Sequence, residues 1–124
     1  MEQIKRIVIA DNSRELCSGF AEALKVHNEF ALAGIANDGK QAIHMVRELQ
    51  PDVLVLDLMI AKEDCLTILK EVRETEKPPV VISISRVVTQ YVAQAINYLG
   101  SKYTLLKPFD MNLLIEKIQE LTNE

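Results

Sequence analysis

Short apolar runs alternate with amphipathic segments along the whole chain. Five of these runs are rich in β-branched residues and predict strands, because such side chains fit a pleated and half-buried surface. They cover residues 4–10, 30–36, 53–56, 80–84 and 103–106. The third run, VLVL, is apolar at every position, which is typical of a central parallel strand buried on both faces. Such a strand implies helices on both sides of the sheet.

The segments between the strands have the spacing of amphipathic helices. We expect helices from Asn12 or Ser13 to about His27, over residues 40–49, 64–75 and 88–99, and from Asp110 to about Leu121. Asn12 or Ser13 and Asp110 can cap the first and last helices, because their side chains accept hydrogen bonds from free backbone N–H groups. Gly100 is expected to end the fourth helix. Strands that alternate with helices predict a doubly wound parallel sheet, and five strands favour the order 2-1-3-4-5.

The composition suits one globular domain, with 48% apolar and 26% charged residues in a chain of 124. A net charge of −4 argues against direct nucleic-acid binding, which needs a cationic surface. No run approaches the roughly 20 apolar residues of a membrane span, and the N-terminus has no secretory pattern. A cytoplasmic protein is therefore expected. Cys17 and Cys65 lack the spacing of metal ligands, and Cys17 is expected to be a buried helix residue.

Polar residues follow four of the five predicted strands. Asp11 and Asn12 follow the first, Asp57 the third, Ser85 the fourth and Lys107 the fifth. In open α/β sheets, ligands bind beyond the carboxyl ends of the strands, at the point where the strand order reverses. For the order 2-1-3-4-5 this point lies between the first and third strands. We therefore expect two carboxylates, an amide, a hydroxyl and an ammonium group to gather at one edge of the sheet.

This set of groups suits phosphoryl transfer. A carboxylate can act as the nucleophile, and a divalent cation with oxygen ligands relieves the repulsion between acidic groups. An ammonium and a hydroxyl supply further stabilisation of the phosphoryl oxygens. Each residue taken alone also fits an ordinary turn or helix cap. The prediction depends on their falling together at one edge.

Four segments resemble the receiver domains of two-component response regulators, and the resemblance covers the whole chain. They are IVIADNSREL, PDVLVLDLM, ISIS and AINYLGSKYTLLKPFDMNLL. The sequence is most similar to the receiver half of the sporulation-initiation transcription factors of spore-forming Firmicutes. The resemblance implies a flavodoxin-like α/β fold in which residues 1–124 form one receiver domain.

The resemblance also implies a role for each polar residue. Asp57 would be the phosphoacceptor, Ser85 the switch hydroxyl and Lys107 the lysine of the family. The implied metal ligands for Mg²⁺ are Asp11, Asn12, Asp57 and the backbone carbonyl of Met59. The implied partner is a histidine kinase or phosphotransfer protein, and the implied output is control of transcription or sporulation. The C-terminal DNA-binding domain usual in the family is not among these residues, and the domain itself would be neither an enzyme nor a membrane protein.

Three departures from the family pattern concern the metal and its loop. Asn12 replaces the second of two adjacent acids, so Mg²⁺ binding is expected to weaken. Ile60 and Ala61 replace the family's Met-Pro, which should loosen the loop after Asp57. Cys65 replaces a glycine and is less suited to a positive φ.

Two further departures concern the switch. Arg86 replaces an alanine and places a long cation beside the phosphoryl pocket. Thr104 replaces an aromatic residue, and Tyr103 lies one position earlier. Because side chains alternate along a strand, Tyr103 should face the other side of the sheet and cannot take that aromatic's place.

These departures leave alternatives open. The chain is either a working phosphoreceiver with weakened metal binding or a pseudo-receiver, a protein-interaction module that phosphate does not switch. An independent enzyme lacks support from any nucleophile–base pair or Gly-rich loop. A flavin-binding protein would share the fold, but its first turn would need a phosphate cradle that the acidic turn here lacks. By family analogy, the face formed by the fourth helix, fifth strand and fifth helix is a candidate homodimer surface.

Overall fold

The computed structural model describes residues 3–123, which form five strands and five helices in strict alternation. The strands are β1 (Lys5–Ala10), β2 (Phe30–Ala36), β3 (Val53–Asp57), β4 (Val80–Ser85) and β5 (Ser101–Leu106). The helices are α1 (Arg14–Leu24), α2 (Gly39–Leu49), α3 (Cys65–Arg73), α4 (Gln90–Tyr98) and α5 (Met111–Thr122). All strand pairs are parallel, in the order β2-β1-β3-β4-β5. The predicted flavodoxin-like fold and strand order are confirmed.

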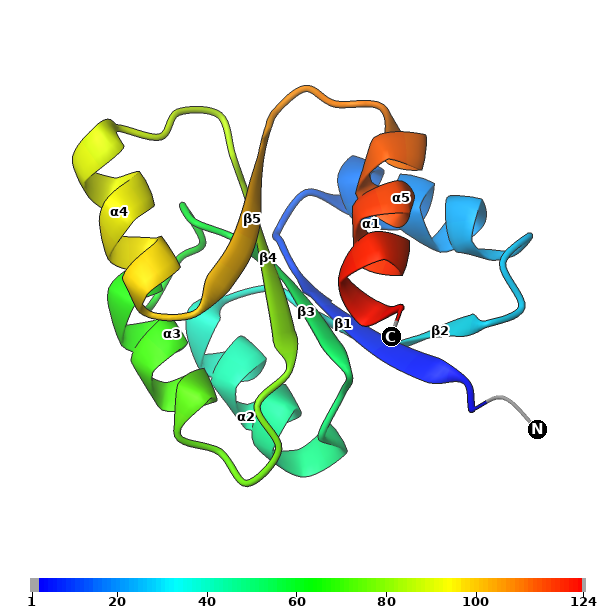
Figure 1. Ribbon diagram of the computed structural model, residues 1–124, viewed down its shortest axis with the longest axis horizontal. Coiled ribbons are helices and arrows are strands. Elements are labelled where there is room, and N and C mark those ends of the chain that lie inside the picture. The colour runs from blue at the N-terminus through cyan, green and yellow to red at the C-terminus, as the bar shows by residue number, and fades with distance from the viewer. Residues whose placement is uncertain (1–2, 124) are drawn as a thin grey trace.

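The helices cover both faces of the sheet, with α1 and α5 on one side and α2, α3 and α4 on the other (Figure 1). Every residue of β3 is buried. Leu54 and Leu56 pack into the core under α2, α3 and α4, whereas Val53 and Val55 pack into the core under α1 and α5. This follows from the two-residue repeat of a strand, which sends successive side chains to opposite faces. A continuous apolar sequence is thus what a strand in the middle layer requires.

Each helix begins at a side chain that accepts a backbone hydrogen bond. These caps are Ser13, Asp38, Asp64, Thr89 and Asp110. Ser13 rather than Asn12 caps α1, with its Oγ 3.1 Å from the N of Leu16. Gly100 follows α4 with a φ of 109°, a left-handed conformation in which glycine is unstrained. The predicted roles of Asp110 and Gly100 are confirmed.

Four boundaries differ from the prediction by two or three residues, one of them the end of α3, which lies at Arg73 and not at residue 75. Helix α1 ends at Leu24, because turn bonds to the carbonyls of Leu24 and His27 bring the chain round to β2. His27 therefore lies in a loop and not in a helix. Helix α4 begins after Thr89, whose Oγ1 accepts from the N of Val92. Strand β5 already begins at Ser101, two residues earlier than expected.

Within residues 3–123, no helix has the length and hydrophobicity that a membrane span requires.

Candidate functional site

Three of the predicted site residues meet at the carboxyl edge of the sheet. Lys107 follows β5, and its Nζ lies 2.9 Å from Oδ2 of Asp11 and 3.5 Å from Oδ2 of Asp57. The side chains of Asp11, Asp57 and Lys107 are 0%, 10% and 14% exposed. The topology explains the meeting, because β1 and β3 are neighbours and the lysine stem reaches them from β5. One ammonium group is thus shared between two nearly buried carboxylates.

Asp11 is the more tightly held of the two carboxylates. Its Oδ1 accepts a hydrogen bond from the N of Ser13 at 2.8 Å, while its Oδ2 contacts Lys107. Its backbone carbonyl accepts a bond from the Cys17 thiol at 3.4 Å. Burial, and then the nearby Asp11 carboxylate, raise the pKa of Cys17, so this thiol stays protonated. Cys17 is buried in α1, as predicted, and its thiol contacts the backbone of Asp11.

Asp57 is the last residue of β3 and lies at the carboxyl edge of the sheet. Its Oδ1 accepts from the N of Met59 at 3.0 Å, and its Oδ2 faces Lys107. The strand continues its pairing for one residue, since the N of Leu58 donates to the carbonyl of Ile84 at 2.9 Å. The chain then turns, which exposes the Met59 side chain. The carboxylate is therefore fixed on both sides at the edge of a rigid strand.

The loop after Asp57 is anchored on the N-terminus of α2, although Ile60 and Ala61 stand where the family pattern has Met-Pro. The N of Gly39 donates to the carbonyl of Ala61 at 2.8 Å, and the Lys62 ammonium lies 3.5 Å from Oδ2 of Asp38. Ile60 is buried in the core under α2 and α3. These contacts hold the loop without a proline.

Cys65 does not adopt the positive φ that its replacement of a glycine suggested. Cys65 is the first residue of α3, and the left-handed residue of this loop is Lys62, with a φ of 73°. Burial, and then the Asp64 charge, raise the pKa of the Cys65 thiol. The positive φ of this loop thus lies three residues before position 65.

Ser85 and Asn12 lie beside this cluster without joining its hydrogen bonds. Ser85 is fully buried, and its Oγ donates to the carbonyl of Val87 at 2.9 Å, within the loop between β4 and α4. Asn12 is exposed, and among residues 3–123 its side chain makes no hydrogen bond. Tyr103 faces α5, where the Lys117 ammonium lies 4.6 Å from its ring centre. The aromatic ring is thus on the face predicted for it, away from Thr104.

The oxygen donors at this edge fit a hard divalent cation. They are the carboxylates of Asp11 and Asp57, the Asn12 amide and the Met59 carbonyl, and Mg²⁺ prefers such ligands. No group of three or more His, Cys, Asp or Glu side chains in the described part of the chain could hold a metal. Only two of the donors are therefore charged. The residue types present fit the ligand chemistry of Mg²⁺.

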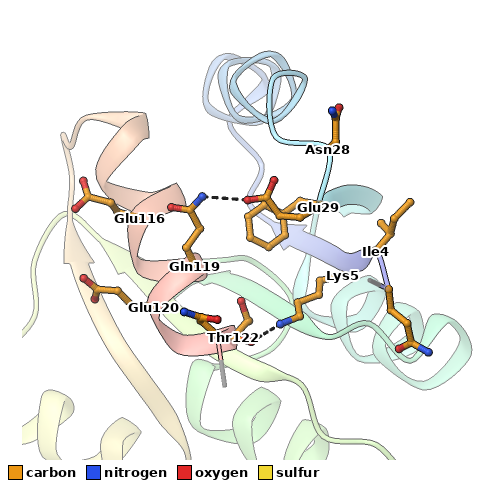
Figure 2. Close-up of a pocket in the computed structure, with 11 residues that line it drawn as sticks. Ile4, Lys5, Asn28, Glu29, Glu116, Gln119, Glu120 and Thr122 are labelled. Atoms are coloured by element: carbon orange, nitrogen blue, oxygen red, sulfur yellow. Dashed lines mark hydrogen bonds between the residues drawn. The ribbon is translucent and has the colours of Figure 1, made fainter. Parts of the chain in front are cut away.

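A groove of about 1140 Å³ lies at the other end of the sheet, where β1 and β2 begin (Figure 2). Gln119 spans it by donating from Nε2 to Oε2 of Glu29 at 3.1 Å, and Lys5 spans it by donating to the carbonyl of Thr122. No pattern in the sequence predicted this groove, because its lining comes from three separate segments. None of the predicted site residues lines it.

Solved structures share the fold over nearly the whole chain. The receiver domain of AraT, a response regulator from Geobacillus stearothermophilus, is 27% identical with a TM-score of 0.85, covering 96% of this chain and 93% of that one. A LuxR-family DNA-binding response regulator from Staphylococcus aureus is 21% identical with a TM-score of 0.87, covering 97% and 100%. The isolated receiver domain of RcsB from Salmonella enterica serovar Typhimurium, solved with the phosphomimetic BeF₃⁻, is 19% identical with a TM-score of 0.85, covering 96% and 88%.

The family model of the response regulator receiver domain matches residues 7–119. This range holds all five strands apart from the first two residues of β1, and it includes every residue of the carboxyl-edge cluster. The chain therefore belongs to the response regulator receiver domain family.

Proposed function

We propose that this chain is a working phosphoacceptor, in which Asp57 takes a phosphoryl group from a histidine kinase or phosphotransfer protein. One observation carries the proposal: the Lys107 ammonium lies within 3.5 Å of carboxylate oxygens of both Asp57 and Asp11 in a pocket that largely excludes water. Electrostatic stabilisation is strongest in such a pocket, because few solvent dipoles screen the charges. Phosphoryl transfer depends mostly on this stabilisation and on positioning.

In the transfer, a carboxylate oxygen of Asp57 forms a bond to phosphorus. The bond from phosphorus to the donor nitrogen of a phosphohistidine breaks, and its electron pair stays on the imidazole. Lys107 neutralises charge on the phosphoryl oxygens, while Asp11 holds Lys107 in place. Receiver domains generally bind Mg²⁺ at their acidic pocket. When bound by Asp11, Asn12, Asp57 and the Met59 carbonyl, this ion would neutralise further charge on the phosphoryl oxygens.

Phosphorylation replaces the single negative charge of the Asp57 carboxylate by a phosphoryl group carrying about −1.5 to −2 charges, and it adds new acceptor oxygens. We infer that the Ser85 hydroxyl then leaves the Val87 carbonyl and donates to a phosphoryl oxygen. The loop between β4 and α4 would shift with it, so that phosphorylation biases two pre-existing arrangements of this loop. The signal would reach the face of α4, β5 and α5, which carries the exposed side chains of Tyr91 and Leu106. This face is the candidate homodimer surface.

The remaining assignments rest on the resemblance. They are a cytoplasmic location, a regulatory and non-enzymatic role, and control of transcription or sporulation through a DNA-binding domain outside these residues. The similarity to the LuxR-family DNA-binding regulator supports a transcriptional output. The resemblance of DNSREL, PDVLVLD and LLKPFDM to the sporulation-initiation factors is the support for the sporulation role.

A pseudo-receiver is the second candidate function. Two observations favour it: position 12 is a neutral asparagine, and the Ser85 hydroxyl is already satisfied by Val87. In that case Asp11, Asp57 and Lys107 would be a buried structural ion cluster. The protein would act by binding a partner, and no phosphodonor would change its structure.

Incubation with acetyl phosphate and Mg²⁺, followed by intact mass measurement, separates the two candidates. We expect the wild-type protein to gain one phosphoryl group and Asp57→Asn to gain none. Asp64→Asn is the matched control, since Asp64 is an exposed carboxylate seven residues later and asparagine also caps helices. A folded wild-type protein that gains no mass, beside an ordinary receiver that does, would favour the pseudo-receiver.

A further inference from the structure

One more cation, Arg86, directly follows β4 at the carboxyl edge of the sheet. Strand β4 lies between β3 and β5, and Asp57 is in register with Ile84. The carbonyl of the following residue, Ser85, accepts from the N of Lys107 at 2.8 Å. Arg86 therefore leaves the sheet between the nucleophile on one side and the pocket lysine on the other.

The side chain of Arg86 is free to turn toward this pocket. It is exposed, and its guanidinium makes no ion pair or hydrogen bond among residues 3–123. Because β4 ends at Ser85, position 86 lies in the bend just beyond the sheet, at the same edge at which Asp57 ends β3.

The charge balance around Asp57 favours a second cation such as Arg86. Asp11, Asp57 and Lys107 leave a formal charge of −1, and Asn12 adds none. A phosphoryl group would make the pocket more negative by roughly one further charge. Lys107 is already shared between two carboxylates. A guanidinium group suits the new charge, because its planar fork donates two parallel hydrogen bonds to phosphoryl oxygens.

We propose that Arg86 binds the phosphoryl group on Asp57. Because Asn12 is neutral and Mg²⁺ is expected to bind weakly, Arg86 supplies positive charge that the metal ion would otherwise provide. The proposal rests on the proposed phosphoacceptor function and assigns to it a second phosphoryl-binding side chain beside Lys107. Arg86 acts only after transfer has begun, since the unmodified Asp57 already has Lys107 and the N of Met59 as partners. Its contribution is therefore to the stability of the phosphorylated state.

The test uses beryllofluoride, a phosphoryl mimic, titrated at fixed Mg²⁺ and detected by ¹⁹F NMR of the protein-bound form. We expect Arg86→Ala to weaken binding about tenfold, the size of one charge-assisted hydrogen bond. Arg86→Lys, which keeps the charge and loses the fork, should weaken it by roughly threefold. Arg47→Ala is the matched control, because Arg47 pairs with Glu71 at 3.3 Å near the end of α2 that is far from the pocket. It should bind beryllofluoride as the wild type does.

Arg86→Ala that binds beryllofluoride as tightly as the wild type, or more tightly, would overturn the inference. A loss of affinity in Arg47→Ala as large as that in Arg86→Ala would also overturn it, because it would show only a general effect of net charge. Normal binding by the wild type with no response to Arg86→Ala would refute this inference alone. A wild-type protein that binds no beryllofluoride and gains no phosphoryl mass would overturn the proposed function with it. Arg86 is exposed, so an unchanged urea midpoint in Arg86→Ala shows that the variant is folded.

Discussion

Replacing Gly39 by alanine tests whether the anchored loop after Asp57 is held by close packing. A Cβ atom at position 39 would lie 2.7 Å from the Cβ of Glu63 and 2.8 Å from Cδ1 of Ile68. It would also lie 3.4 Å from the Ala61 carbonyl, whose hydrogen bond from the N of Gly39 fixes the loop. The Glu63 contact involves an atom next to the backbone, so the loop itself must move to accept the methyl group.

Two opposing effects set the size of the change in stability. Overpacking of this kind costs about 1–3 kcal/mol. Alanine in place of glycine gains at most about 1 kcal/mol in a helix, and Gly39 is the first residue of α2. We therefore expect the free energy of unfolding to fall by about 1–2 kcal/mol, with a Tm lower by roughly 4–10 °C. The displaced loop carries Met59, so labelling by acetyl phosphate should also slow.

Urea unfolding followed by circular dichroism measures this effect, and Gly19→Ala is its control. Gly19 is exposed in α1, and a Cβ there would lie 3.6 Å from Cε of Met111, an ordinary contact. Gly19→Ala should therefore gain about 0.5–1 kcal/mol from helix propensity alone. A Gly39→Ala variant at least as stable as the wild type, with Gly19→Ala behaving as expected, would refute the view that the loop is held by contact with α2.

Two further substitutions test the acidic groups near the pocket. Asn12→Asp adds a charged oxygen ligand, so the Mg²⁺ concentration at half-saturation should fall by roughly tenfold, measured by titration calorimetry; an unchanged affinity would show that position 12 does not reach the metal. Asp64 accepts bonds from the N and Oγ1 of Thr67, and the bond from the backbone N is the main cause of the lowered pKa of its carboxyl. A lowered pKa stabilises the fold above the ordinary value of 3.8, and this contribution is lost as the pH falls through the lowered pKa. The stability advantage of the wild type over Asp64→Asn should therefore be present at pH 7 and shrink below pH 3.8, as urea midpoints across this range would show.

The sequence predicted the fold well because periodicity and capping are local. The run VLVL indicated a fully buried strand, and Ser13, Asp110 and Gly100 marked helix ends through their own chemistry. The meeting of Asp11, Asp57 and Lys107 also followed, because parallel strands of known order bring their carboxyl ends to one edge.

The remaining features depend on contacts between distant segments. The bond between Gly39 and Ala61 joins two loops, so no local pattern reveals it. The left-handed conformation of Lys62 results from that anchoring and contradicts the ordinary preference of a lysine. The Ser85 hydroxyl donates to the Val87 carbonyl because of the arrangement of the loop between β4 and α4, which no local pattern of the sequence reveals.

The two carboxylates of the pocket are not equivalent, and their difference favours Asp57 as the nucleophile. The Asp11 side chain is fully buried, and both of its oxygens are held, one by the N of Ser13 and the other by Lys107. A phosphodonor has no path to it without breaking these bonds. The Asp57 side chain is 10% exposed, against 0% for Asp11, and its contact to Lys107 is longer, at 3.5 Å against 2.9 Å. The ammonium is thus bound mainly by Asp11, which leaves the outer carboxylate able to attack and the lysine in place to receive the charge that arrives with the phosphoryl group.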